Sequence, residues 1–340
     1  MRIAIVRLSS LGDVVHTLPV ACAIRRHDPL AHIRWIVEEH EQVLLRGNPV
    51  VDEVVVAPLR RWRSLLARGR LAALAGELRR FARQVRAGRV DVTIDVQGWV
   101  HKTSPLVALT RAPVRIGFSR EHARDRWSPL FTNCHVVPDP SSHVVDQNLA
   151  LLRPLGIEGP PVIWSLPPWP GAAERAEAWM AAHGLAGRPP VVLLPSTRGR
   201  RKQWPPRSYA ELARRLAAAG RVVVMAGGPA DEDVFRAIAS QEAGIEAYAP
   251  PEVGDLAALL ARAALVVGND TGPLHLAAAA GVPTIGLFGP TSGRRNGPYG
   301  PNGAFIQSPT GRMADIAVKI VAEHALRALA GELQEQTFVR

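Results

Sequence analysis

The chain has 340 residues, which exceeds the size at which a single hydrophobic core usually stops growing, so we expect two domains. Its net charge is +11, from 41 Lys and Arg against 30 Asp and Glu. Such a surplus favours an anionic partner such as nucleic acid, phospholipid head groups or a phosphorylated substrate. The alternative explanation is a solvated surface in an organism whose proteins are generally rich in arginine. The two cysteines, Cys22 and Cys134, form no C-x-x-C pair, which argues against a zinc site or redox dithiol and fits a reducing cytoplasm.

Short apolar runs alternate with helical patterns in the first half of the chain. The opening run is too short for a secretory signal and predicts a buried strand, and no uncharged run reaches the ~18 to 20 residues of a spanning helix. We therefore expect a soluble, cytoplasmic protein that contacts at most the face of a membrane. The expected strands are 3–8, 32–37, 53–56, 92–96 and 114–118, and the expected helices are 13–26 and 62–85.

The same alternation returns after a proline-rich segment, which suits an interdomain linker. The expected strands are 191–194, 222–225, 264–267 and 284–287, and the expected helices are 208–219, 256–262 and 314–329. Strands separated by helices predict parallel sheets. We expect an α/β fold of two doubly wound, Rossmann-like domains facing each other across a cleft: 1–160, a linker at 161–170, 171–312, and a C-terminal helix in 313–340 that packs back on the first domain.

Two charged features in the first half have both a structural and a functional interpretation. Gly12 and Asp13 follow the first strand. Asp13 is there either a helix cap or a general base that faces the cleft. On geometry alone a capping role is favoured, because caps are far commoner than bases. Arg60, Arg61 and Arg63 open a helix, where such a run is usually solvated but also suits carboxylate or phosphate.

Two loops of the second half have the composition of a phosphate site. The segment 195–205 follows a strand and combines Ser196 and Thr197 with four cations that end at Lys202, so a diphosphate site is favoured over a solvated basic loop. The segment 268–276 again leads from a strand into a helix whose free amides suit a phosphate, and Asp270 there suits sugar hydroxyls. His275 taken alone is more simply a core histidine.

The sequence lacks the patterns of a metal or P-loop site. It contains no G-x-x-x-x-G-K-[ST] and no H-E-x-x-H or clustered His/Cys set. Asp231-Glu232-Asp233 has the D-x-D spacing of a Mg²⁺ site in some transferases, but it follows Gly-Gly-Pro and predicts the acidic start of a helix. We therefore expect no metal and no cofactor.

Taken together, these motifs resemble glycosyltransferase family 9, the heptosyltransferase family, over nearly the whole chain. Residues 268–275, 281–283 and 287–291 are similar to its donor signature, which is far more specific than a lone glycine-rich loop; residues 7–19, 95–98 and 143–148 also fit. Residues 9–16 and 60–63 look most like the heptosyltransferase I branch, which transfers L-glycero-D-manno-heptose from ADP-heptose to Kdo on lipid A. The resemblance implies a GT-B fold, inversion at the anomeric carbon and no required metal.

The resemblance also implies roles for individual residues. It makes Asp13 the general base, outweighing the preference for a cap, although both roles are compatible. The implied donor-binding residues are Ser196, Thr197 and Lys202 on the diphosphate, Asp270 on the heptose, Thr271, Gly272 and His275 near the phosphates, and Glu232 on the ribose. The implied acceptor-binding residues are Gly12, Arg60, Arg61, Arg63, Lys102 and Arg120. The loop between Thr197 and Lys202 is one residue longer than the family pattern, which leaves open which cation meets the diphosphate.

The expected partners are ADP-heptose, the Kdo-lipid A acceptor and the anionic cytoplasmic face of the inner membrane, to which a monomer would bind peripherally. Three alternatives remain open. Heptosyltransferase II or another family member would act on a different acceptor, and a sugar-nucleotide epimerase would share the fold. A basic nucleic-acid-binding protein would use the charge, but the sequence has no nucleic-acid motif or aromatic stacking platform.

Overall fold

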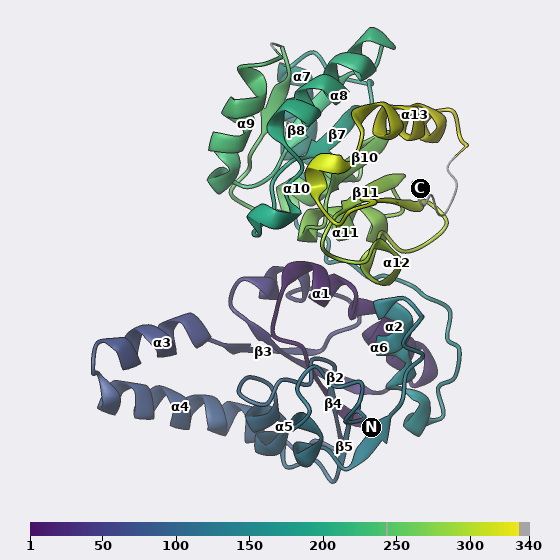
Figure 1. The fold of residues 1–340 in the computed structure, drawn as a ribbon. Helices are drawn as coiled ribbons and strands as arrows, with labels where there is room; N and C mark the ends of the chain where they lie inside the picture. The colour runs from purple at the N-terminus through teal and green to yellow at the C-terminus, as the bar shows by residue number, and fades with distance from the viewer. Residues whose placement is uncertain (243, 333–340) are drawn as a thin grey trace. The chain divides into compact units, whose positions relative to one another are not determined.

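The computed structural model describes residues 1–242 and 244–332, and the chain divides into two units, Met1–Pro168 and Trp169–Arg340 (Figure 1). The division falls inside the segment predicted as a linker. Each unit contains one parallel six-stranded sheet with helices on both faces. Strands buried on both faces need continuous apolar runs, and these runs are the ones that the sequence shows.

The first unit has the strand order β3-β2-β1-β4-β5-β6. Its strands are β1 Arg2–Val6, β2 His32–Glu38, β3 Glu53–Ala57, β4 Val92–Asp95, β5 Val114–Phe118 and β6 Cys134–Val136. The order reverses between β1 and β4, which pair in parallel from Ile3 with Val92 to Val6 with Asp95. Ligands of doubly wound sheets bind beyond the carboxyl ends of the strands at such a point.

The second unit repeats this topology, with the order β12-β11-β10-β7-β8-β9. Its strands are β7 Val191–Leu194, β8 Val223–Ala226, β9 Glu246–Tyr248, β10 Leu265–Asn269, β11 Thr284–Phe288 and β12 Gly303–Gln307. Numbered from its own first strand, the order again runs 3-2-1-4-5-6, and the reversal lies between β7 and β10. The two doubly wound α/β units that the sequence predicted are therefore confirmed.

Each of the two helices predicted for the first unit is divided in the structure, which also contains helices that were not predicted. They are α1 Leu11–Val15, α2 Leu18–His27, α3 Leu59–Ala67, α4 Leu71–Arg86, α5 Ser104–Thr110 and α6 Val144–Ala150, with 3-10 turns η1 Glu41–Leu44, η2 Ser128–Phe131 and η3 Arg153–Leu155. The predicted helix 13–26 is α1 and α2, because Pro19 starts a new helix near Thr17. The predicted helix 62–85 is a hairpin, because Gly69 turns the chain at a φ of +66°.

The second unit contains α7 Ala172–Ala182, α8 Pro206–Ala218, α9 Glu232–Ala239, α10 Val253–Leu260, α11 Gly272–Ala279, α12 Gly293–Asn296 and α13 Val318–Leu329, with η4 Arg200–Lys202, η5 Pro229–Asp231 and η6 Met313–Asp315. The buried face of α13, including Val321 and Ala325, joins the core that contains Tyr209 and Leu216 of α8. The apolar face of α13 is therefore used within the second unit, and packing of the C-terminal segment on the first domain stays a prediction. The predicted C-terminal segment continues into residues 333–340, which lie outside the described residues.

Among the residues that the structure describes, none of the helices is both long enough and apolar enough to cross a bilayer.

Candidate functional site

Asp270 is the centre of the polar cluster in the second unit. It follows β10, which lies between β7 and β11, and the loops after all three strands reach it. Its carboxylate oxygen Oδ2 accepts hydrogen bonds from Lys202 Nζ at 2.6 Å and Thr291 Oγ1 at 3.0 Å. His275 Nε2 lies 3.3 Å from Oδ1, and Thr197 donates to the Asp270 carbonyl at 3.1 Å.

The contacts of Asp270 keep its carboxyl group ionised. Burial alone raises its pKa, but the hydrogen bonds and charges of His275 and Lys202 outweigh burial and hold the pKa well below the ordinary value. An ionised carboxylate accepts hydrogen bonds and does not donate them. Asp270 is therefore suited to hold hydroxyl groups and not to act as an acid.

Asn269 and Trp204 fix the loops that surround this cluster. The Asn269 side chain donates to the Pro195 carbonyl at 2.7 Å and accepts from the Trp204 amide at 3.0 Å, so it joins the loops after β7 and β10. The Trp204 indole is fully buried and donates to the Ile316 carbonyl at 3.1 Å. Gly268 allows the strands to come close, because a Cβ there would lie 2.6 Å from Leu194 Cβ.

The structure brings most of the predicted donor-binding residues together at this edge of the sheet. Thr271 is the N-cap of α11 and Gly272 its first residue, so the amides of that helix start beside Asp270. The Ser196 hydroxyl is buried, and no protein group among the described residues hydrogen-bonds it. Among the cations of the longer loop, Lys202 pairs with Asp270, whereas Arg198, Arg200 and Arg201 are exposed.

The acidic triplet after β8 is a helix start, as predicted. Asp231 Oδ2 accepts a hydrogen bond from the Gly228 amide at 2.8 Å, and Asp233 is 92 % exposed. Glu232 is the exposed first residue of α9, one strand away from the Asp270 cluster. The structure therefore places Glu232 apart from the cluster. Within residues 1–242 and 244–332, no group of three His, Cys, Asp or Glu side chains is arranged to hold a metal ion.

Asp13 lies beyond the carboxyl end of β1 in the first unit. Its Oδ2 accepts hydrogen bonds from the Ser10 amide and the Ser10 hydroxyl, both at 3.0 Å, so it caps α1 as the sequence suggested. Its Oδ1 lies 2.5 Å from Arg7, whose buried guanidinium also donates to the Val96 carbonyl at 3.1 Å. The Asp13 side chain is nevertheless 36 % exposed, and Gly12 is buried beside it in α1.

Glu38 contacts both Ser9, in the loop that leads to Asp13, and Lys102, one of the predicted acceptor-binding cations. It ends β2 and accepts a hydrogen bond from Ser9 Oγ at 3.2 Å. Lys102 Nζ lies 3.8 Å from the same carboxylate and 4.3 Å from the centre of the Trp99 ring. Lys102 is therefore held near the loop that leads to Asp13.

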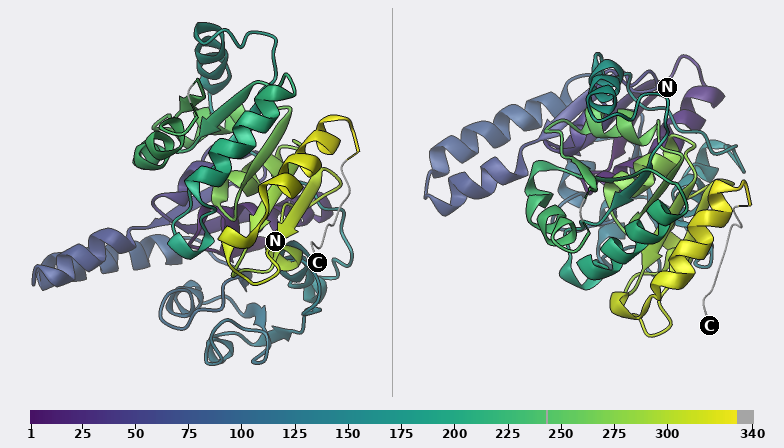
Figure 2. Two further views of the ribbon diagram at one scale, coloured as in Figure 1. Left: turned by 45° about the horizontal axis from the view of Figure 1, so that its top comes forward. Right: turned by 90° about the horizontal axis from the view of Figure 1, so that it is seen from above.

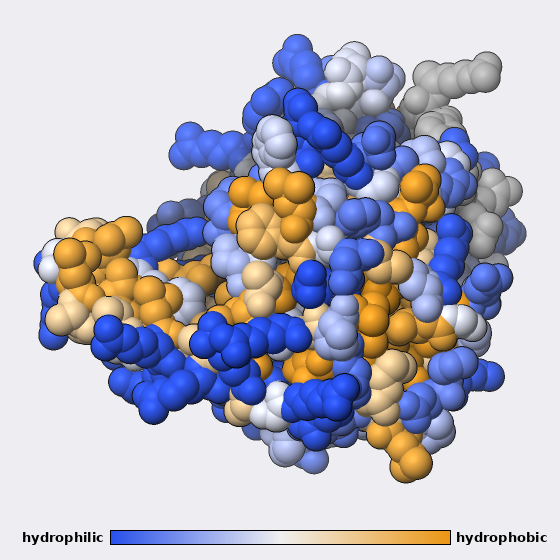
Figure 3. All heavy atoms as spheres, turned by 90° about the horizontal axis from the view of Figure 1, so that it is seen from below, coloured by the Kyte–Doolittle hydropathy of each residue, from blue (hydrophilic) through white to orange (hydrophobic). Residues whose placement is uncertain are grey.

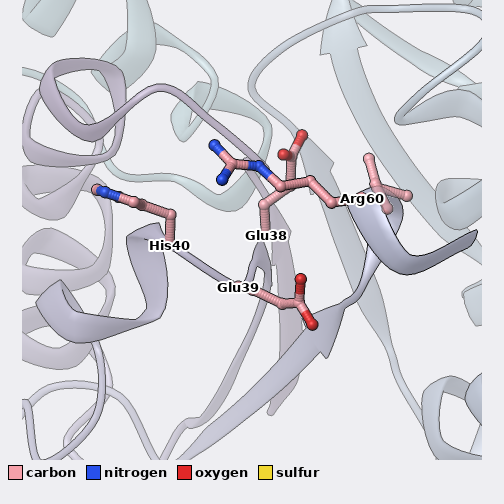
Figure 4. A pocket seen from close by; sticks show the side chains of 5 residues that line it. Glu38, Glu39, His40 and Arg60 are labelled. Carbon is pink, nitrogen blue, oxygen red and sulfur yellow. The ribbon is translucent and has the colours of Figure 1, made fainter. Parts of the chain in front are cut away.

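The predicted arginines have different surroundings. Arg60 lines a hollow of ≈ 210 Å³ with Glu38, Glu39, His40 and Leu59, and Figure 4 shows its side chain extending from the start of α3 over Glu38. Arg61 instead pairs with Glu77 of α4 at 2.6 Å, and Arg63 is exposed on α3. Arg120 lies over the Trp127 ring at 5.3 Å. The structure thus gathers Arg60 and Lys102 around Glu38 and gives Arg61 and Arg120 other contacts.

The sequence assigned no role to three residues of these clusters: Arg7, Glu38 and Thr291. Arg7 directly follows β1, Glu38 ends β2, and Thr291 lies three residues after the end of β11; this closeness to a strand's carboxyl end was the available signal. The partner of each, however, comes from a different loop, and spacing does not reveal it.

Comparison with known proteins decides the family. Residues 78–325 match the sequence profile of glycosyltransferase family 9 (heptosyltransferase). The chain belongs to this family. It is 33 % identical over 306 residues to lipopolysaccharide heptosyltransferase 1 of Pseudomonas aeruginosa, covering 88 % of this chain and 82 % of that protein. It is 29 % identical over 324 residues to lipopolysaccharide heptosyltransferase 1 of Escherichia coli K12, covering 95 % and 98 %.

The solved structure of E. coli heptosyltransferase WaaC with ADP-2-deoxy-2-fluoro heptose superimposes with a TM-score of 0.76 at 29 % identity, covering 96 % of this chain and 99 % of that chain. Membership of the family confirms the predicted GT-B class of fold and the predicted enzyme class. The protein is a glycosyltransferase of family 9.

Proposed function

We propose that this glycosyltransferase moves L-glycero-D-manno-heptose from ADP-heptose to Kdo of Kdo-lipid A, with inversion, in the assembly of the lipopolysaccharide inner core. The Asp270 cluster carries the proposal: three neighbouring loops bring hydroxyls, a lysine and a helix start to one carboxylate. A relative of the same fold was solved with an analogue of ADP-heptose, and relatives aligned along most of the chain are heptosyltransferases.

The second unit has the groups needed to bind a diphosphate-linked sugar. Lys202 and the amides at the start of α11 supply positive charge for the diphosphate. Ser196 and Thr197 supply hydroxyl donors, and Asp270 accepts hydrogen bonds from the heptose. Glu232 is proposed for the ribose. Because these groups neutralise the leaving diphosphate, we propose that the reaction needs neither a metal nor a cofactor.

The proposed reaction is a direct displacement. The Asp13 carboxylate takes the proton of a Kdo hydroxyl while that oxygen bonds to the anomeric carbon of heptose. The bond from this carbon to the β-phosphate oxygen breaks, and ADP leaves with the bonding electrons. A positioned base typically contributes about 10² to 10⁴-fold. Arg7 and Ser10 hold the Asp13 carboxylate in one orientation.

The first unit supplies the acceptor side of this proposal. Kdo carries a carboxylate, for which the guanidinium group of Arg60 and the ammonium group of Lys102 are suitable partners. Gly12, Arg61, Arg63 and Arg120 complete the proposed acceptor set. The lipid part of the acceptor favours an enzyme bound peripherally to the anionic, cytoplasmic face of the inner membrane, and we propose that it works there as a monomer.

A transfer assay with ADP-heptose and a short-chain, soluble Kdo-lipid A tests the proposal. The product should gain the mass of one heptose, and Asp13→Asn should lower turnover by about 10² to 10⁴-fold while calorimetry shows unchanged ADP affinity. Asp233→Asn is the matched control, because Asp233 is 92 % exposed, and it should behave as wild type.

Other outcomes of the same assay would replace the proposal. Donor turnover without acceptor would indicate an epimerase, and transfer only to a heptose-bearing acceptor would indicate heptosyltransferase II. Activity should survive EDTA; a loss restored by Mg²⁺ would show that the reaction needs a metal and would make Asp231 and Asp233 candidate ligands.

A further inference from the structure

The α3–α4 hairpin extends away from the rest of the first unit, as both views of Figure 2 show. It is anchored at its base, where Phe81 and Val85 of α4 are buried and Trp62 of α3 packs on Phe81 at 5.0 Å. No residue of α3 is fully buried. The outer half of the hairpin, around the turn at Gly69, therefore has little to do with the stability of the core.

Most of the charge surplus of the protein lies in this hairpin. Residues 59–89 contain ten arginines and one acidic residue, Glu77, so they carry +9 of the net charge of +11. Glu77 is already paired with Arg61. Arg68 and Arg70 flank the turn, and Arg79, Arg80 and Arg83 lie along α4; all five are exposed.

The same segment exposes large apolar side chains. Leu66 is 58 % exposed, Leu71 is 62 % exposed and Leu78 is 42 % exposed. Leu66 lies in the last turn of α3 and Leu71 starts α4, so both lie beside the turn at Gly69. Figure 3 shows this projection with apolar side chains gathered at its end and strongly polar ones next to them. Clustered leucines beside arginines are typical of surfaces that lie at a membrane interface.

We propose that the α3–α4 hairpin docks on an anionic phospholipid bilayer, with Leu66 and Leu71 inserted among the head groups and the arginines beside them on lipid phosphates. Charge alone would also suit a nucleic acid, but a polyanion in water gives no reason to expose leucines between the arginines. The proposal deepens the proposed function, on which it rests, because it says how the enzyme reaches a lipid-linked acceptor.

The dimensions of α3 fit this arrangement. Leu66 lies six positions after Arg60, which at a rise of 1.5 Å per helical residue is about 9 Å along the helix axis. Interfacial helices insert about 5 to 10 Å into the boundary of head groups and acyl chains. With α3 directed along the membrane normal and the turn inserted to that depth, Arg60 would lie about level with the membrane surface, where the sugars of a lipid-linked acceptor begin.

Flotation with phospholipid vesicles tests the proposal on the full chain. Wild type should bind vesicles of phosphatidylcholine with roughly a third phosphatidylglycerol, bind pure phosphatidylcholine poorly, and lose binding as salt rises. Leu66→Ser with Leu71→Ser should weaken binding on the order of tenfold or more. The control pair Leu30→Ser with Ile163→Ser alters side chains that are 90 % and 42 % exposed outside the hairpin, and should bind as wild type.

A second matched set of variants tests how much the arginines of the hairpin contribute to vesicle binding. Arg68→Gln with Arg70→Gln should weaken vesicle binding, whereas Arg188→Gln with Arg221→Gln removes the same charge from exposed positions of the second unit and should not. Unchanged binding of the leucine pair, or equal losses in both arginine pairs, would overturn the proposal in favour of diffuse charge. Loss of duplex DNA binding in the hairpin arginine pair, with vesicle binding intact, would point instead to nucleic acid.

Transfer to the soluble acceptor separates this proposal from the proposed function. All four variant pairs should keep wild-type turnover on that substrate and an unchanged thermal unfolding transition. If wild type itself does not transfer heptose, the proposed function fails, and the vesicle comparison still decides whether the hairpin is a membrane-docking element.

Discussion

The carboxylates of Asp13 and Asp270 both lie beyond the carboxyl ends of central strands, but their surroundings differ. Asp270 is 12 % exposed and is held by Lys202, His275 and Thr291. Asp13 is 36 % exposed and is oriented by Arg7 and Ser10. A carboxylate open to solvent can meet an acceptor hydroxyl, whereas a carboxylate enclosed by donors can only hold a ligand in place. The difference supports a base role for Asp13 and a binding role for Asp270.

Arg7 should act as a positioning residue for Asp13. Arg7→Lys and Arg7→Met should lower kcat by about 10 to 100-fold with little change in the KM for ADP-heptose, because the Arg7 guanidinium contacts the Val96 carbonyl through one nitrogen and the Asp13 carboxylate through another, a fork that neither Lys nor Met can reproduce. Steady-state kinetics measure the split between kcat and KM.

A double-variant comparison distinguishes positioning by Arg7 from a purely structural role. In an Asp13→Asn background, Arg7→Met should cause almost no further loss of turnover, because its effect acts through Asp13. Additive losses, together with a lowered thermal transition that accounts for them, would mean that Arg7 only stabilises the fold.

Asp270 should make stability depend on pH in the acid range. Its folded-state pKa is lowered, so the stabilisation is fully present above the unfolded-state pKa of about 3.9 and is lost as the pH falls below that value. Asp270→Asn should destabilise the protein by about 1 to 3 kcal/mol near neutral pH. Urea unfolding should show the difference from wild type shrinking below about pH 4. A difference that stays constant down to about pH 3 would contradict this account.

At the scale of the elements, the sequence predicted the centres of both sheets better than their edges. Strands such as β1 and β10 are buried on both faces and give continuous apolar runs. The edge strands β6 and β9 have three residues each, and two of the three in β9 are exposed, so they leave almost no pattern. The helical periodicity continues across Gly69, which hid the turn between α3 and α4.

The place of the candidate residues could be predicted where it depends on chain position, although position alone favoured a capping role for Asp13 and its predicted base role came from the family resemblance. Asp13, Lys202 and Asp270 follow central strands, and parallel strands of one sheet end at one edge. The Arg7–Asp13 and Thr291–Asp270 contacts could not be predicted, because each depends on how a loop directs its side chain. The apolar face of α13 likewise does not reveal which core it covers.

Two glycines should respond to alanine in opposite directions. Gly268→Ala places a Cβ 2.6 Å from Leu194 Cβ, between β10 and β7, and should destabilise the protein by about 1 to 3 kcal/mol and weaken ADP binding. Gly76→Ala lies within α4 with no atom within 4 Å of the new Cβ, and should stabilise by about 0.5 to 1 kcal/mol. Urea unfolding of both variants measures these changes; a neutral Gly268→Ala would mean that the strands separate easily.

At the scale of the whole molecule, the charge is uneven. The α3–α4 hairpin and the residues just after it, 59–89, carry +9 of the net +11, so the surplus is not an even background of solvated arginines. The Asp270 cluster, in contrast, combines its cation with a mostly buried carboxylate. Exposed charges are screened by salt far more than buried ones. Salt should therefore affect the acceptor and donor steps differently.

The KM for the soluble acceptor should rise with salt more steeply than the KM for ADP-heptose. Near physiological ionic strength, salt strongly screens charges that lie more than about 8 to 10 Å apart. The attraction of the exposed Arg60 and Arg63 side chains for an anionic acceptor should therefore weaken as salt rises. Arg60→Ala with Arg63→Ala should raise the acceptor KM at low salt, flatten its salt dependence and spare ADP affinity.

Arg61 is left intact because it is paired with Glu77. Arg188→Ala with Arg221→Ala, a change of equal charge in the second unit, should keep the wild-type slope. An unchanged acceptor KM in the Arg60 and Arg63 variant would show that these two arginines are ordinary solvated side chains.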